Sequence, residues 1–311
     1  MWLGIENTDG EPGIILAFEN GVQLFGPGVT LDKAALERLH LERFRSDYTM
    51  RLGSIPFDGV RVGANPPDFE IKTRDDGWKR LDCMILPFED RRNGHALFLR
   101  LRDKLMTEQR DFSNIADCWV QIWFSGGGGL PPKKSDQDTV DQLAALLEGS
   151  EIDRAAIAAV VAGIPESGFP AQLPAALMPQ ELPDGSAGVH VAPHAEGWAA
   201  AVDTPFAKAL GFECGFGMAT TWTVSDFDAE LQRLLAQHDK PEIQHALVTI
   251  GGPDNAGTRF PGEDALVQFL STPRPMAVGP FSHLEKVSFH LWGSGMVGEL
   301  SGREDPDPKA E

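Results

Sequence analysis

The sequence predicts an α/β fold of the α+β kind: a helix, a mixed β-sheet, a second helix and a further strand, followed by a second, acidic α/β region. Segments with apolar residues at helical spacing are mixed along the chain with short segments of alternating polarity, and Gly and Pro clusters separate them. The chain has 311 residues and is 42% hydrophobic, which suffices for one large domain or two ordinary ones with a sizeable core.

The first region, residues 1–130, is predicted as an α/β domain. Its first helix follows Thr30 and runs to about Arg45, because Leu36 and Phe44 lie on one side of it. Extended segments are predicted at 13–26 (a hairpin), 48–52, 58–63, 68–73, 78–86 and 118–124, and a second helix follows the capping residue Asp90. The order along this region is therefore helix, two or three strands, helix, strand.

The second region, residues 136–301, is also predicted to be α/β. Helices are predicted near 136–148, 153–163, 226–238 and 262–270, and strands at 189–192, 198–202, 243–250 and 284–292. The passage 164–188 is rich in Pro and Gly and is predicted to be irregular. The charged tail 302–311 is predicted to be disordered. The two regions either form separate domains or pack as one.

Charge is distributed unevenly between the two parts of the chain. The net charge is −19 overall, and residues 1–135 carry −2 of it, whereas residues 136–311 carry −17. A uniformly basic surface for nucleic acid is therefore excluded, although the first part can carry a local basic face. The acidic part should repel polyanions, and it fits either a partner-binding or dimerising role or the ordinary surface of a soluble protein.

Cysteine usage and hydropathy indicate a cytoplasmic protein. The three cysteines, Cys83, Cys118 and Cys214, are far apart and odd in number, which favours buried thiols over disulfides or a zinc site. The sequence contains no run of about 18 apolar residues, so no membrane contact is expected. The first residues lack the basic and apolar pattern of a secretory signal.

A cluster of charged residues follows Pro66-Pro67, on the predicted hairpin. Asp68, Glu70 and Lys72 lie at i, i+2 and i+4, on one face of the first strand, and Asp82 lies on the polar face of the second. Carboxylates beside a lysine can hold Mg²⁺ or Mn²⁺ and activate water. Simple alternation produces the same pattern when the intervening apolar residues face the core, so an ordinary hairpin is the alternative.

This element order and the Pro-Pro-Asp entry resemble the PD-(D/E)xK nuclease-like superfamily over residues 29–124. The resemblance implies a core of one helix, three antiparallel strands, a helix and a further strand. It also implies Mg²⁺ ligands at an Asp that begins the second core strand and at an acid in the third, with a lysine two residues after that acid. A glutamate of the first helix sometimes joins such sites, and Glu37 and Glu42 are available.

Two placements of the motif are possible. In the first, which we favour, Asp68 and Asp82 are the two acids, but Met84 stands where the lysine is expected. Lys72 or Lys79 would then have to supply the charge. In the second, Asp58 is the leading acid, the tripeptide 70–72 is the acid-x-lysine element, and an extra strand intervenes before the helix.

The resemblance implies a metal-dependent nuclease acting on DNA, with a link to restriction or anti-phage defence. Asp68, Asp82 and Glu70 would bind the metal, and Lys72 would assist. Phosphate contacts are expected from the basic helix, through Arg91, Arg92 and Arg100. The alternative is a catalytically inactive scaffold or binding subunit of a larger complex, which Met84 and the net charge of −19 favour.

The histidines are not predicted to act in catalysis. His238, His245 and His283 are scattered along the chain, and His290 is predicted as a half-buried residue of the last strand.

Overall fold

The computed structural model describes residues 2–8, 11–17, 22–26, 28–64, 66–74, 77–86, 89–108, 110–116, 118–125, 130, 133–155, 180–193, 210–260, 262–263, 267 and 278–301. The fold is α/β, as the sequence predicts. The chain divides into two compact units. Unit 1 comprises Met1–Gly4, Ile15–Asn20 and Glu89–Thr220, and unit 2 comprises Ile5–Ile14, Gly21–Phe88 and Thr221–Glu311.

This division differs from the regions 1–130 and 136–301 that the sequence suggests. The chain leaves unit 2 after Phe88 and returns to it at Thr221. Parallel strands require a crossover connection, because the chain must return to the same end of the sheet. In unit 2 that connection is long enough to contain most of unit 1.

Unit 2 is built around one six-stranded sheet. Its strands are β4 (Gly59–Val62), β5 (Phe69–Thr73), β6 (Gly77–Ile85), β11 (His245–Ile250), β13 (Lys286–Leu291) and β14 (Met296–Ser301). They lie in the order β14-β13-β11-β6-β5-β4. β11 is parallel to β6 and β13, whereas β4, β5 and β6 pair antiparallel, and β14 is antiparallel to β13. The short strands β3 (Val22–Gln23) and β12 (Thr258–Arg259) form a separate pair.

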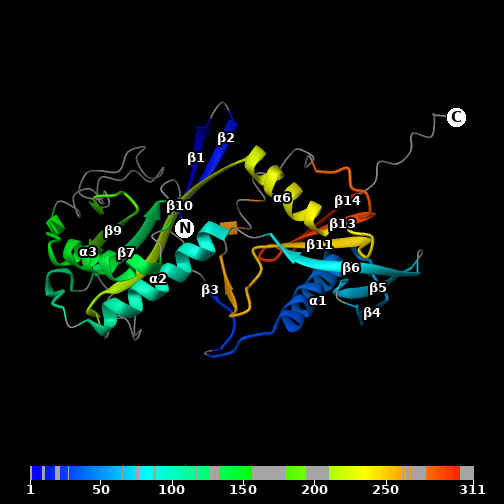
Figure 1. The fold of residues 1–311 in the computed structure, drawn as a ribbon, viewed down its shortest axis with the longest axis horizontal. Coiled ribbons are helices and arrows are strands. Elements are labelled where there is room, and N and C mark those ends of the chain that lie inside the picture. Colours follow the sequence, from blue (N-terminus) through cyan, green and yellow to red (C-terminus); the bar gives the residue numbers. More distant parts are fainter. Residues whose placement is uncertain are drawn as a thin grey trace. The chain divides into compact units, whose positions relative to one another are not determined.

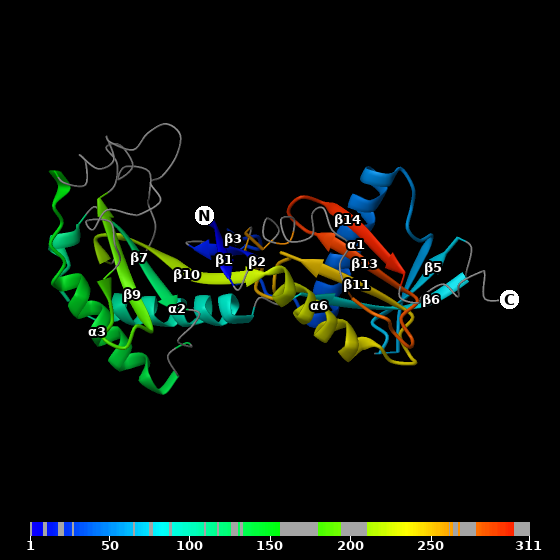
Figure 2. The same ribbon diagram turned by 90° about the horizontal axis from the view of Figure 1, so that it is seen from above.

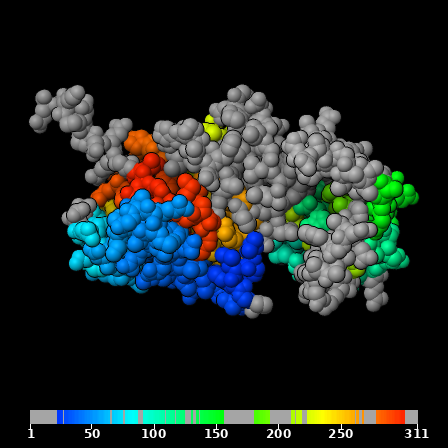
Figure 3. All heavy atoms as spheres, turned by 180° about the vertical axis from the view of Figure 1, so that it is seen from behind, coloured from blue at the N-terminus to red at the C-terminus, as the bar shows by residue number. Residues whose placement is uncertain are grey.

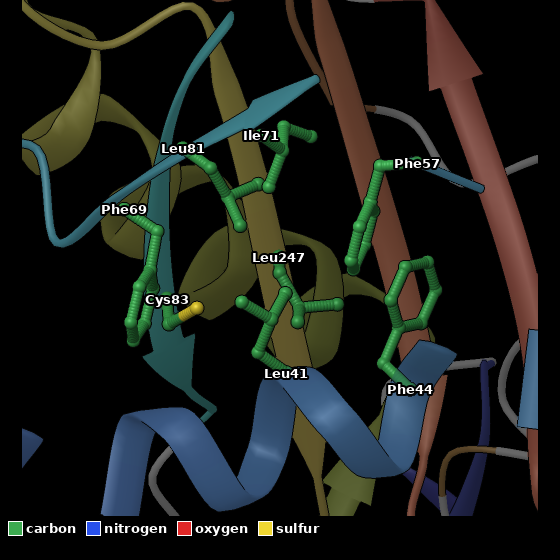
Figure 4. Close-up of a cluster of buried hydrophobic side chains, with 8 residues drawn as sticks. All are labelled: Leu41, Phe44, Phe57, Phe69, Ile71, Leu81, Cys83 and Leu247. Carbon is green, nitrogen blue, oxygen red and sulfur yellow. The ribbon is translucent and has the colours of Figure 1, made fainter. Parts of the chain in front are cut away.

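Two helices, α1 (Lys33–Leu52) and α6 (Val224–His238), lie on opposite faces of this sheet (Figures 1 and 2). α1 starts where the Asp32 carboxylate accepts the N–H of Ala35 at 2.8 Å, and it ends at Gly53, whose φ of 67° suits a glycine. Leu41 and Phe44 of α1 are buried against the strands, as Figure 4 shows. α1 also contacts β14, and the two lie side by side in Figure 3.

The buried face of the hairpin has the predicted alternation. Phe69 and Ile71 of β5 and Leu81 and Cys83 of β6 belong to one core cluster with the α1 side chains (Figure 4). Residues between them on each strand therefore point to the other face of the sheet. This parity decides where the polar residues of β5 and β6 lie.

Unit 1 contains most of a second sheet. Its elements are α2 (Glu89–Thr107), α3 (Asp136–Glu148), the 3₁₀ turns η1 (Ser113–Ile115) and η2 (Lys133–Ser135), β7 (Cys118–Ser125), β8 (Gln180–Glu181), β9 (Ala187–Pro193) and most of β10 (Glu213–Thr223). With β1 (Trp2–Thr8) and β2 (Glu11–Ala17), the strands have the order β1-β2-β10-β7-β9-β8. β10 and β7 are parallel.

Two elements that were predicted to complete the hairpin sheet lie elsewhere. α2 and β7 belong to unit 1, and β7 pairs with β10 and β9 rather than with β6. Their places next to β6 are taken by α6 and β11. β11 pairs with β6 in parallel over five residue pairs. The predicted order helix, three strands, helix, strand therefore occurs in unit 2, but with a different second helix and last strand.

Other predicted elements have mixed outcomes. Residues 48–52 are the last turns of α1 and not a strand. The hairpin predicted at 13–26 does not form, because β3 pairs with β12 and β2 lies between β1 and β10. The predicted segments 198–202 and 302–311, and most of 153–163, 164–188 and 262–270, lie outside the described residues.

Candidate functional site

The candidate site lies at the fork where β5 and β6 separate. The last backbone pair between these strands joins Phe69 to Leu81, so the next residues, Asp68 and Asp82, come opposite each other. Beyond this pair, the carboxylate of Asp68 accepts a hydrogen bond from the backbone N–H of Cys83 at 2.9 Å. The hairpin register alone therefore brings the two predicted acids together.

The backbone at the end of β4 packs closely against the residues that precede β5. The N–H of Gly63 donates to the carbonyl of Asp68 at 2.9 Å. A Cβ atom at Gly63 would lie 2.0 Å from the carbonyl oxygen of Pro67, which is closer than atoms can approach. Only glycine allows the backbone to pass here, and the contact holds Asp68 at the fork.

The two carboxyl groups form a hydrogen bond in a nearly solvent-free position. The side chains of Asp68 and Asp82 are only 5% and 8% exposed. Burial, a hydrogen bond with Asp82 and the charge of Asp82 raise the pKa of Asp68 to about 7. Burial opposes ionisation of Asp82 too, but hydrogen bonds from His238 and Asp68 lower its pKa. At acidic pH the proton therefore resides on Asp68.

Lys33 and Glu37 reach this pair from the first turns of α1. The Lys33 ammonium nitrogen lies 3.1 Å from Glu37 Oε1 and 3.7 Å from Asp68 Oδ1. Its side chain is 72% exposed, so the cation lies at the solvent side of the carboxylates. Burial raises the pKa of Glu37, and the hydrogen bond to Glu37 raises that of Lys33. Glu42, the other candidate on α1, pairs with Arg38 on the surface.

His238 completes the site from the opposite face of the sheet. It is the last residue of α6, and its Nδ1 hydrogen-bonds Asp82 Oδ2. The next residue, Asp239, accepts the backbone N–H groups of residues 282–284 at 2.7–3.0 Å. This second contact holds the end of α6, and thereby His238, in place.

Glu70 and Lys72 share the polar strand face with Asp82 but are not part of the pair. Glu70 forms an ion pair with Arg61 of β4. Lys72 is exposed and lies four residues from Asp68, or about 13 Å along an extended strand. Lys79 is paired with Glu285 at 2.8 Å. None of the lysines proposed from the sequence therefore stands beside the two acids.

The three arginines predicted to hold phosphate lie on α2, in unit 1, whereas the carboxylates lie in unit 2. Arg91 is only 1% exposed, so it is not on the surface where a nucleic-acid phosphate would bind. Arg92 and Arg100 are partly exposed. For Arg91 the predicted role is wrong, because its position on α2 faces the interior.

The structure brings together the two acids that the first placement names. Asp68 and Asp82 share a hydrogen bond, whereas Asp58 is exposed and its N–H donates to the carbonyl of Lys72. Met84 is buried at the position where the lysine was expected. Within the described residues, no group of three or more His, Cys, Asp or Glu side chains is already arranged to hold a metal ion.

The sequence predicts neither Lys33 nor His238 as a residue of the site. Lys33 had a weak signal, since it lies four residues before Glu37 and such pairs attract on a helix. His238 had no signal, because 156 residues separate it from Asp82.

Comparisons with protein-family models, with curated proteins and with solved structures found no match. Among the described residues, no helix has both the length and the apolar character needed to cross a membrane.

Proposed function

We propose that this protein hydrolyses phosphodiester bonds of DNA with a divalent cation, at the site formed by Glu37, Asp68 and Asp82. The observation that carries the proposal is the pairing of Asp68 and Asp82 at the fork of β5 and β6. Along the chain, the elements around the fork follow in the order α1, β4, β5, β6, α6 and β11. This is the order that resemblance to the PD-(D/E)xK nuclease-like superfamily implies, with 89–220 between the third strand and the second helix.

Mg²⁺ or Mn²⁺ fits the donors at this site. Glu37, Asp68 and Asp82 supply carboxylate oxygens, which hard cations prefer. A bound cation would lower the pKa of a water molecule and offset negative charge at the phosphate. Asp68 and Asp82 must both be ionised to bind it, so they release the proton of their hydrogen bond. Glu70 is engaged by Arg61 and is left out of the proposed ligands.

Lys33 takes the role of the lysine that Met84 replaces. Its ammonium group already neutralises part of the charge of Glu37 and Asp68. Since the side chain is largely exposed, it can turn to a phosphate oxygen and stabilise negative charge that develops there. His238 holds the carboxylate of Asp82 through its Nδ1.

The proposal is tested by cleavage of single-stranded and duplex DNA with Mg²⁺ or Mn²⁺. Asp68→Asn and Asp82→Asn should each reduce cleavage to background and weaken Mn²⁺ binding measured by calorimetry. Lys33→Met should lower kcat by about 10²-fold, as the loss of one charge-stabilising group does. Arg38→Met is the matched control, since Arg38 is also a cation of α1 but pairs with Glu42 on the surface.

A catalytically inactive scaffold is the second candidate. It is favoured by the buried Met84 and by the hydrogen bond between the two acids and the Lys33 contact, which satisfy the carboxylates without any metal. If the wild type binds no Mn²⁺ and Asp68→Asn behaves like it in every cleavage assay, the scaffold is the better description.

The setting of the activity is also a proposal. Cys83, Cys118 and Cys214 are buried, as predicted, which supports a reducing, cytosolic environment. A role in restriction or defence rests on the resemblance alone, and a protein partner or a homo-oligomer stays a prediction from the acidic second part of the sequence.

A further inference from the structure

A second feature of unit 2 is the sheet face that leads away from the carboxylate pair, here called the outer face. It is the polar side of β4, β5 and β6, opposite the side that α1 covers. Its members are Gly59, Arg61, Glu70, Lys72, Trp78 and Arg80.

Strand register orders the outer face into rows. One row crosses the three strands at Arg61, Glu70 and Arg80, and the next at Gly59, Lys72 and Trp78. Asp82 continues the series along β6, two residues beyond Arg80. Rows two residues apart are separated by about 6.6 Å, so Trp78 lies about 13 Å from Asp82. The rows of the outer face thus lead along β6 toward the candidate site.

The outer face is open to solvent where β4 and β5 lie. Trp78 is 42% exposed and the Arg61 side chain is 56% exposed, and Lys72 is exposed as well. α6 lies beside β11, away from β4 and β5, and its last residue, His238, contacts Asp82 (Figures 1 and 2). A ligand can therefore lie on the outer face over β4 and β5.

Trp78 is held in position as an exposed aromatic surface. The guanidinium carbon of Arg61 lies 4.3 Å from the centroid of its ring, and Arg61 is fixed in turn by Glu70. A Cβ atom at Gly59 would come within 3.3 Å of Cη2 of Trp78, so the glycine lets the ring lie close to the strand. Because the ring is already ordered, a ligand that stacks on it loses little additional freedom.

Charge on the outer face differs from that of the whole chain. It carries three cations, Arg61, Lys72 and Arg80, against one carboxylate, Glu70, whereas the chain carries −19. A polyanion is therefore attracted to this face and repelled by much of the remaining surface. An ordered aromatic ring among cations is the arrangement with which sheet surfaces bind unpaired bases and their phosphates.

We infer that the outer face binds a single strand of nucleic acid, with a base stacked on Trp78 and phosphates near Lys72 and Arg80, and directs it to Asp68 and Asp82. For cleavage of the bound strand at Asp68 and Asp82, the inference rests on the proposed function. Binding itself requires no metal and no cleavage, so it is measured separately. An acidic protein segment would use the cations but gain little from the exposed ring.

The experiment measures binding of a fluorescent oligothymidine by anisotropy, with the full chain and without divalent cations. The wild type should bind it more tightly than a duplex of equal length. Trp78→Ala should weaken binding by about 10-fold, the effect of losing one stacked base, and Trp78→Phe should restore most of it. Lys72→Glu should weaken binding and make it less dependent on salt.

Arg38→Glu is the matched control for Lys72→Glu. Both substitutions change the net charge by the same amount, but Arg38 lies on α1, which covers the other face. It should leave binding unchanged. Equal losses in the two charge variants, tighter binding of duplex than of single strand, or no binding by the wild type would overturn the inference. Thermal unfolding of each variant shows that a loss of binding is not a loss of fold.

The outcomes for binding and for cleavage are distinguishable. Asp68→Asn should bind oligothymidine like the wild type and fail to cleave it. Binding that depends on Trp78 without any cleavage by the wild type would leave the outer face as proposed and refute the nuclease function. Cleavage that is unaffected by Trp78→Ala and Lys72→Glu would leave the nuclease function as proposed and refute the role of the outer face.

Discussion

Among its described residues, unit 2 contains two pairs of the same chemistry, Asp82 with His238 and Asp47 with His290. In the second pair, His290 Nε2 lies 2.9 Å from Asp47 Oδ2, and both residues are almost fully buried. Arg43 also contacts Asp47 at 2.9 Å, and the rings of Phe44 and Trp292 lie against His290. That pair joins α1 to β13 inside the core.

The pairs differ in charge balance and access. Asp47 has two basic partners and an enclosed position, so its charge is compensated. Asp82 lies next to a second carboxyl group, Asp68, which contacts the exposed Lys33. An excess of carboxylates next to solvent can take up a cation, whereas a compensated pair can only hold the fold together. The difference shows that a His–Asp contact alone does not indicate function.

The largest effect should come from Asp47→Ala. It leaves His290 buried without its partner, and we expect a loss of about 3–5 kcal/mol in unfolding free energy, measured with denaturant. Asp82→Ala should cost less than half of that, because His238 is partly exposed and can be hydrated. Similar losses in both variants would contradict the distinction between a structural pair and a site.

Gly63→Ala tests how the fork is held. A Cβ atom would collide with the carbonyl of Pro67, so we expect a loss of up to about 3 kcal/mol and a displaced Asp68. Mn²⁺ affinity should fall in parallel. Gly298→Ala on β14 is the control, since nothing lies within 4 Å of the added atom. A neutral Gly63→Ala would mean that the β4 end does not position the acid.

The raised pKa of Asp68 predicts that stability depends on pH. The pKa of Asp68 is raised from 3.8 to about 7 by burial and by Asp82, so the folded protein binds more protons than the unfolded chain between these values. Stability should therefore fall as pH rises through this window, by about 2 kcal/mol after solvent screening. Asp68→Asn should reduce this fall. An unchanged pH profile of denaturant unfolding in that variant would contradict the raised pKa of Asp68.

The smallest effect is expected on the surface of α1. Glu42→Gln removes an exposed ion pair with Arg38 and should change unfolding free energy by less than about 0.5 kcal/mol. Glu37→Gln should likewise leave stability nearly unchanged but weaken Mn²⁺ binding. Of these two glutamates, Glu37 is the one that pairs with Lys33, which also contacts Asp68. Equal Mn²⁺ binding in both variants would remove Glu37 from the site.

Local sequence patterns determined the α/β class, the strands β4, β5 and β6, and the approach of Asp68 to Asp82. These features depend on alternation, on a capped helix and on one hairpin register, all within a short stretch of chain. Alternation also predicts the strand face on which Glu70 and Lys72 lie. It does not predict that Glu70 forms an ion pair with Arg61, or that Lys72 lies too far along β5 to reach the two acids.

What completes the sheet and the site depends on contacts between segments far apart in the sequence. β11 rather than β7 pairs with β6, and α6 brings His238 to Asp82 across 156 residues of sequence. Parallel pairing and contacts of this kind depend on which distant segments fit best, which no local pattern records. For the same reason Arg91 was predicted as a surface cation and is buried, and Lys33, which was not predicted as a site residue, lies at the candidate site.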